Sequence, residues 1–150
     1  GRDGALDYGV DASISGGTVI AIGITGMANT FSSSSEQASL LYNCSSEKAG
    51  TNITLKDSDG NKIVSAKASK IYSSVAISSP DLVVGDTYTL VFGSTTYSVK
   101  LSDTSTTVDN GVTNIQGEPT GGGGGGGGGS QMPSTPPASG GGSQTTNTVN

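Results

Sequence analysis

The sequence predicts an all-β protein, and three observations lead to this prediction. Apolar and polar residues alternate over short stretches, as in strands with one buried face. Clusters of turn-forming residues separate these stretches roughly every 8 to 12 residues. No stretch of useful length has the apolar period of a helix. We expect three parts: the end of a parallel β-helix in residues 1–31, a β-sandwich-like cap in 32–118 and a disordered tail in 119–150.

Residues 4–23 contain three short β-prone pieces separated by glycines, with a turn at Gly16-Gly17. Short pieces with tight Gly corners suit one rung of a β-solenoid, in which each piece pairs with its copy one rung away. Leu6 and Met27 stand at matching places of a weak internal repeat, 21 residues apart. One and a half rungs cannot bury their own faces, so we expect further rungs upstream. Two hairpin strands of a sandwich are the open alternative.

From Leu40 onward the alternation predicts a small antiparallel sandwich. Its core has room for one thin layer of apolar side chains. We expect it to cover the open end of the β-helix, because an exposed terminal rung is an aggregation edge. The predicted strands contain Ile53 and Leu55, residues 63–66, Val75 and Ile77, Tyr88 to Phe92, and Tyr97 to Leu101.

The last 32 residues have a different composition. They carry no charged residue, contain 12 of the 25 glycines, and include an unbroken run from Gly121 to Gly129. So few apolar side chains cannot offset the ordering entropy of a fold. We expect a flexible Gly/Pro/Ser/Thr spacer.

The composition excludes several classes of function. The chain has no His, which rules out His-based triads and His-ligated metals. A net charge of −5 with one Arg argues against nucleic acid as a partner. Cys44 is the single cysteine and allows neither a disulfide framework nor a CxxC site. No apolar run approaches the length of a membrane span.

The segment Asp11 to Val19 reads DASISGGTV and resembles the rung motif D-[IA]-[ST]-I-S-G-G-T-V. That motif belongs to a bacterial family called carbohydrate-binding domain-containing proteins, formerly a domain of unknown function. Ala5-Leu6-Asp7 stands where the family has G-I-D or A-L-D, and a Gly-rich C-terminal tail is typical of the family. Further segments that match the family follow in the same order: residues 26–28, 31–35, 39–43, 55–61, 77–82 and 85–90.

The resemblance implies a secreted or cell-surface protein with a calcium-containing, right-handed parallel β-helix that binds cellulose and polygalacturonate. Asp7 matches the rung Asp of the family, and Asp11 matches the Asp that opens the next strand. The resemblance also implies that most of the β-helix, including its Asp-rich rungs, lies outside this sequence.

Candidate site residues lie in the first eleven positions. Asp3, Asp7 and Asp11 are spaced by four and could offer carboxylates to calcium across stacked rungs. Solvated turn aspartates are the plainer alternative. Tyr8 lies beside a turn, where an exposed ring could stack on a sugar, whereas the alternation around Tyr88 and Tyr97 predicts burial. The sequence therefore leaves a calcium site and solvated turns open for the aspartates, and it indicates a carbohydrate contact at Tyr8.

The predicted function is non-catalytic binding of plant cell-wall polysaccharide, either cellulose or an acidic pectin-type glycan, with calcium as a possible aid. One alternative is a structural or adhesive surface protein without glycan specificity. Another is a pectate-lyase-like enzyme whose active residues lie upstream. We expect no catalysis within these residues: a lyase needs a basic side chain near the abstracted proton, and Arg2, the one Arg of the chain, lies at its first residues. The oligomeric state is left open.

Overall fold

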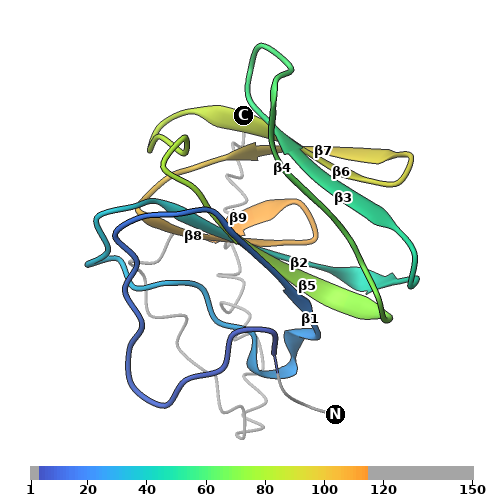
Figure 1. The fold of residues 1–150 in the computed structure, drawn as a ribbon, viewed down its shortest axis with the longest axis horizontal. Coiled ribbons are helices and arrows are strands. Elements are labelled where there is room, and N and C mark those ends of the chain that lie inside the picture. The colour runs from blue at the N-terminus through green and yellow to red at the C-terminus, as the bar shows by residue number, and fades with distance from the viewer. Residues whose placement is uncertain (1–3, 115–150) are drawn as a thin grey trace, which may run out of the picture. The chain divides into compact units, whose positions relative to one another are not determined.

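The computed structural model of the chain describes residues 4–114 (Figure 1). The tail predicted for 119–150 and the calcium candidate Asp3 lie outside this range. The described chain is all-β apart from one short 3₁₀ turn, η1, at Thr25–Met27. Its strands are β1 Val19–Gly23, β2 Ser39–Glu47, β3 Asn52–Lys56, β4 Lys62–Lys67, β5 Tyr72–Ser78, β6 Thr87–Phe92, β7 Thr95–Lys100, β8 Ser105–Asp109 and β9 Val112–Asn114.

These strands form two open sheets. Sheet A has the order β1-β5-β2-β8-β9, and sheet B has the order β4-β3-β6-β7. Neighbouring strands are antiparallel except β2 and β8, which run parallel. All five strands predicted from the alternation after residue 50 are present, as β3 to β7. The all-β prediction is confirmed for the described residues.

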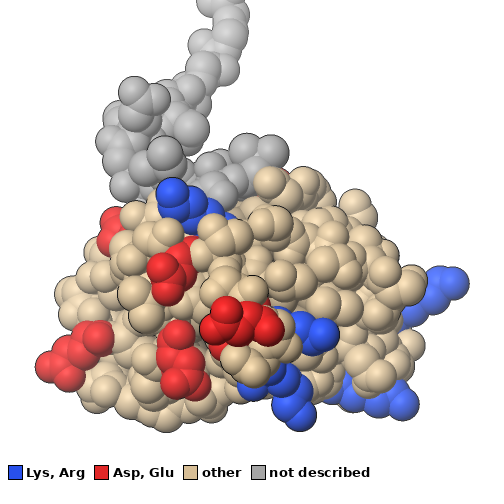
Figure 2. Space-filling view, turned by 90° about the horizontal axis from the view of Figure 1, so that it is seen from above, with Lys and Arg blue, Asp and Glu red and all other residues tan. Residues whose placement is uncertain are grey.

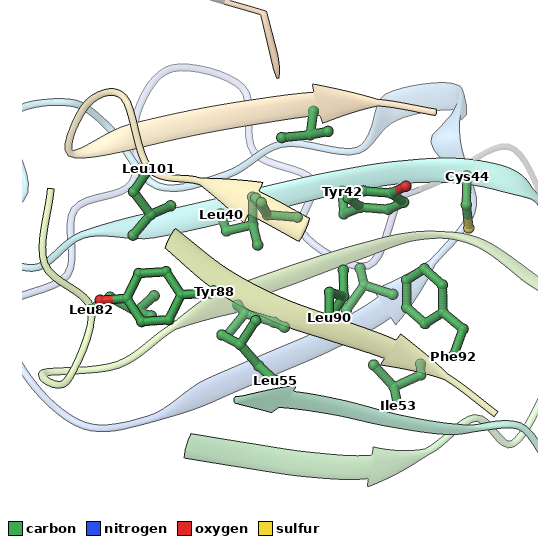
Figure 3. Packing of buried hydrophobic residues seen from close by; sticks show 14 of the residues in the cluster. Leu40, Tyr42, Cys44, Ile53, Leu55, Leu82, Tyr88, Leu90, Phe92 and Leu101 are labelled. Atoms are coloured by element: carbon green, nitrogen blue, oxygen red, sulfur yellow. The ribbon is translucent and has the colours of Figure 1, made fainter. Parts of the chain in front are cut away.

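One hydrophobic core lies between the two sheets (Figure 3). Leu40 and Tyr42 of β2 point toward it from sheet A, and Leu55 and Leu90 point toward it from sheet B. Each side chain of this size that leaves water contributes about 1.5–3 kcal/mol to folding. Phe92 joins the two layers, because its ring meets that of Tyr42 edge to face, with 5.5 Å between centroids.

The burial predicted for two tyrosines can be compared directly. Tyr88 is buried, as the alternation in β6 predicts, and its hydroxyl accepts a hydrogen bond of 2.7 Å from the Val83 amide. Tyr97 is only half-buried, because it lies in β7 at the edge of sheet B, where no further strand covers it. Its ring still contacts Tyr42, with 5.2 Å between centroids.

The end of a parallel β-helix predicted for residues 1–31 is not seen in the described residues. Val19–Gly23 instead forms the edge strand β1, which pairs antiparallel with β5. Ile20 and Ile22 pack on the shared core, so the alternation of this piece fits a half-buried strand of sheet A. Residues 19–23 therefore form a strand of a sandwich, as in the open alternative, but the strand pairs with the distant β5 and not with a hairpin neighbour.

Candidate functional site: a cleft on the outer face of sheet A

The chain on either side of β1, up to β2, covers the face of sheet A that points away from sheet B (Figure 1). It leaves a cleft of about 400 Å³ between this covering segment and the strands β2 and β8. Ligand sites commonly have volumes of about 300–1,000 Å³. We call it the sheet-A cleft; its wall includes Tyr8, Asn29 and Phe31, and its floor includes Leu41, Asn43 and Thr107.

The wall is held by hydrogen bonds between two stretches of the covering segment. The amide of Asn29 donates to the Leu6 carbonyl at 3.1 Å, and the amide of Ser32 donates to the Ala12 carbonyl at 2.7 Å. The Tyr8 hydroxyl donates to the carbonyl of Thr30. The bonds to the carbonyls of Leu6 and Ala12 hold the backbone on either side of Tyr8, and the hydroxyl bond holds the far end of its ring. The ring is thereby fixed at the rim of the cleft.

The floor follows from the parallel pairing of β2 with β8. Leu41 stands opposite Thr107, and Asn43 stands opposite Asp109. Leu40 and Tyr42 point into the core, so Leu41 and Asn43 necessarily face outward. The Asn43 amide Nδ2 donates to Asp109 Oδ1 at 2.6 Å, a charge-assisted bond that locks the Asn43 side chain.

One acceptor at this floor has no partner. Asn43 Oδ1 is buried and makes no hydrogen bond within the described residues. Buried polar atoms are nearly always paired, because an unpaired acceptor loses the bonds that water would give it. This oxygen is itself out of contact with solvent, so it costs folding free energy rather than offering an accessible acceptor to a ligand.

Burial raises the pKa of Tyr8, and the nearby carboxylate of Asp11 raises it further. The hydroxyl therefore stays protonated at neutral pH and keeps its donor role toward Thr30. Tyr8, proposed from the sequence as an isolated exposed ring, is in fact half-buried and lines the cleft.

The structure does not gather the predicted calcium candidates into a site. Asp7 and Asp11 are both exposed in the segment before β1. Within residues 4–114 no group of three or more Asp, Glu, Cys or His side chains stands close enough to hold a metal ion. Calcium binding by Asp7 and Asp11 thus stays a prediction, and Asp3 lies outside the described residues.

Chemically, the cleft offers uncharged groups only. The residues that line it supply hydroxyls, two side-chain amides and two aromatic rings, and none of them carries a formal charge. Amides and hydroxyls can both donate to and accept from the hydroxyls of a polyol. Asn29, Asn43 and Thr107 were missed from the sequence, because only the folding of residues 4–38 over sheet A turns an outward strand face into a cleft.

Comparisons with known proteins give no further assignment: no family model, curated protein or solved structure matches this chain. Among the described residues, no helix is long and apolar enough to cross a membrane.

Proposed function

We propose that this protein binds a polysaccharide without catalysis and that the sheet-A cleft holds part of the sugar chain. The observation that carries the proposal is the lining of the cleft, in which aromatic rings stand beside hydroxyls and amides without any charge. Sugars present an apolar C–H face and a periphery of hydroxyls, so they use both kinds of group. Plant cell-wall cellulose or a pectin-type glycan is the partner, and the protein acts outside the cell or at its surface.

The absence of charge in the cleft lining also bears on catalysis. Glycoside hydrolysis usually needs two carboxyl groups that flank the scissile bond. None of the residues lining the cleft is Asp or Glu, and Asp109 beside it accepts a hydrogen bond from Asn43. A binding role therefore fits these residues better than a hydrolytic one.

The end of a parallel β-helix, predicted for residues 1–31, stays a proposal for the described chain before β1, together with the segment after η1 that pairs with it. Support comes from hydrogen bonds that join residues 20 to 22 positions apart and in the same chain direction: Tyr8 to Thr30, Ile14 to Ser35, and Gln37 to Gly17. An offset that varies by only two residues is typical of successive coils of a solenoid. In this proposal residues 4–17 form one coil on which residues 28–37 stack.

Calcium is proposed at Asp7 and Asp11, on the coil formed by residues 4–17. Both carboxylates are exposed and so are free to complete a site with oxygens of a further coil or of an acidic glycan. Calcium titration by calorimetry on the full chain, with Asp7→Ala beside it, tests this role. Unchanged affinity in the variant would remove Asp7 as a ligand.

The test of glycan binding is a pull-down of the full chain on insoluble cellulose and on polygalacturonate gel, with calcium and with EDTA. Thr107→Ala and Asn29→Ala each remove a polar group from the cleft, and we expect both to weaken retention several-fold. Thr96→Ala is the matched control, because Thr96 is an exposed strand threonine on sheet B. Retention of neither glycan by the unchanged protein would refute the proposal and favour a purely structural surface role.

A further inference from the structure

The strand β1 forms an edge of sheet A, and its outer side has no neighbour among the described strands. On its inner side it pairs with β5 along all five of its residues. Within residues 4–114, no other backbone hydrogen bond reaches residues 19–23. An edge strand of this kind presents a row of unpaired N–H and C=O groups, which can serve as a template for a further strand.

β1 also lacks the features that protect the other sheet edges from further pairing. At the edges of sheet B, β4 carries two lysines and a register shift against β3, and β7 carries Lys100. The other edge of sheet A, β9, has three residues. Lysines, bulges and short length each discourage the addition of a strand. By contrast, β1 has five uncharged residues, no proline and an unbroken register with β5, so it is the described edge best suited to a further strand.

A largely apolar cleft of about 380 Å³ lies where β1 ends. Its lining includes Ile22, Ile24 and Ile71, and the side chain of Ile71 is 66% exposed. Ile22 is only partly buried where it packs on the core, so the core is incompletely covered at this edge. Apolar side chains that gather on an exposed surface mark interaction sites, whereas single ones are ordinary. The cleft therefore extends the free edge of β1 into a docking surface.

The sequence of β1 suits pairing with a second copy of itself. Residues 20–22 read Ile-Ala-Ile in both directions, so an antiparallel pair centred on Ala21 sets Ile20 of each copy opposite Ile22 of the other. Both isoleucines pack toward the core, so all four lie on one face of the pair. Side chains directly opposite each other are the contacts that stabilise a sheet. The same register places Val19 of the second copy opposite Gly23, beside the apolar cleft.

The charges at the two ends of β1 are complementary in this arrangement. Lys70 is exposed and lines the cleft where β1 ends. Asp81 lies near its start, because the Ser79 hydroxyl is 3.3 Å from both the Thr18 hydroxyl and the Asp81 carboxylate. β1 ends toward the right in Figure 1, and Figure 2, which shares the horizontal axis, shows Asp and Glu mainly on the left and Lys mainly on the right and along the lower edge. Antiparallel pairing brings the Lys70 end of each copy to the Asp81 end of the other.

We propose that two copies of this chain associate through β1, in antiparallel register about Ala21, and join their A sheets into one continuous sheet. A strand of five residues is about 17 Å long, so the contact falls short of the roughly 800 Å² per partner of a standard interface. We therefore expect a weak dimer, with a Kd of about 0.1 mM. Its two-fold axis is perpendicular to the joint sheet, so both sheet-A clefts open on the same side. The dimer itself does not rest on the proposed function.

Sedimentation of the full chain between about 10 μM and 1 mM tests the dimer. The average molar mass should rise with concentration from 14.7 kDa toward twice this value. Ala21→Lys sets like charges opposite each other and should weaken association about 5-fold, as should Ala21→Glu. An equimolar mixture of the two variants should restore the dimer, because position 21 faces itself only in this register. Val10→Lys is the matched control, since Val10 is 97% exposed and the substitution adds the same charge outside β1.

A monomer over the whole concentration range overturns the proposal. So does a dimer that Ala21→Lys leaves unchanged, or a mixture of folded variants that stays monomeric. Hydrogen exchange of the unchanged protein needs no variant and decides the case if a substitution of Ala21 unfolds the chain. Amides of residues 19–23 should gain protection as concentration rises, while those of the edge strand β7 should not; equal behaviour of the two edges overturns β1 as the interface. None of these measurements uses a glycan, so their outcome is independent of the polysaccharide function.

Discussion

The hydrogen bond between Asn43 and Asp109 at the floor of the cleft allows a stringent test of the structure. Asn43→Asp replaces the donor Nδ2, which stands 2.6 Å from Asp109 Oδ1, with a second carboxylate oxygen. The variant loses a hydrogen bond to a charged group, worth about 1.5–3 kcal/mol, and gains a like-charge contact. We expect a loss of at least about 2 kcal/mol in the free energy of unfolding at pH 7.

The loss should depend on pH with a defined sign. The neighbouring carboxylate raises the pKa of the carboxyl introduced at position 43 above the value of about 3.9 in the unfolded chain. The penalty is therefore full above the folded-state pKa and disappears as pH falls toward the unfolded value, where a shared proton restores the hydrogen bond. Urea unfolding of the variant and the unchanged protein at pH 7, 5.5 and 4 measures this dependence.

Asn52→Asp provides the control for the same chemical change. Asn52 is exposed on β3 opposite Lys67, and its side chain makes no hydrogen bond in the described residues. We expect its free energy of unfolding to stay within about 0.5 kcal/mol of the unchanged protein. Equal effects of the two substitutions, or a loss at position 43 that is the same at every pH, would show that the described contact with Asp109 does not exist.

Three further predictions concern the core, the cleft wall and the Lys56–Lys62 pair of sheet B. Burial raises the pKa of Tyr42 to about 12, so this side chain should account for roughly 2–3 kcal/mol of the stability that is lost as pH rises from 10 toward 12. Tyr72 and Cys44, whose pKa values burial also raises, add to the loss, so Tyr42→Phe should reduce the fall in urea unfolding without abolishing it. Gly23→Ala should destabilise the protein by about 1–3 kcal/mol, because the added Cβ would lie 2.5 Å from a backbone nitrogen of the covering segment. The control is Gly16→Ala, whose added Cβ would have no atom within 4 Å. Thermal melts of the two variants measure the difference. Lys56→Glu places a negative charge opposite Lys62 and should stabilise the protein by about 0.2–1 kcal/mol. If thermal melts at high salt show the same gain in stability, its origin is not electrostatic.

The strands of sheet B could be predicted because their side chains obey a local rule. In β6, Tyr88, Leu90 and Phe92 are buried while the residues between them are more exposed, and this period of two is visible in the sequence. The turn between β3 and β4 was also readable, since Asp57, Gly60 and Asn61 are turn residues. Gly60 adopts φ +84°, which favours glycine.

The strands of sheet A were harder to predict because both of its faces are covered. β5 was predicted through Val75 and Ile77, although six of its seven residues are buried and the alternation of a half-exposed strand is nearly lost. The parallel pairing of β2 with β8 joins segments more than 60 residues apart, and no local pattern encodes it. β8 and β9 therefore had no counterpart among the predicted strands.

The sequence by itself determined the all-β class, the hairpins of sheet B and the exclusion of His-based chemistry, because these follow from composition and from the period of two along each strand. It indicated Tyr8 as a binding residue but not the residues that line the cleft with it. The tertiary structure alone decided that β1 joins sheet A, that Asn43 meets Asp109, and that residues 4–38 cover one sheet face to leave a cleft. It also brought Lys62 opposite Lys56 through a bulge. These features depend on register and on contacts between distant segments, which a single sequence does not specify.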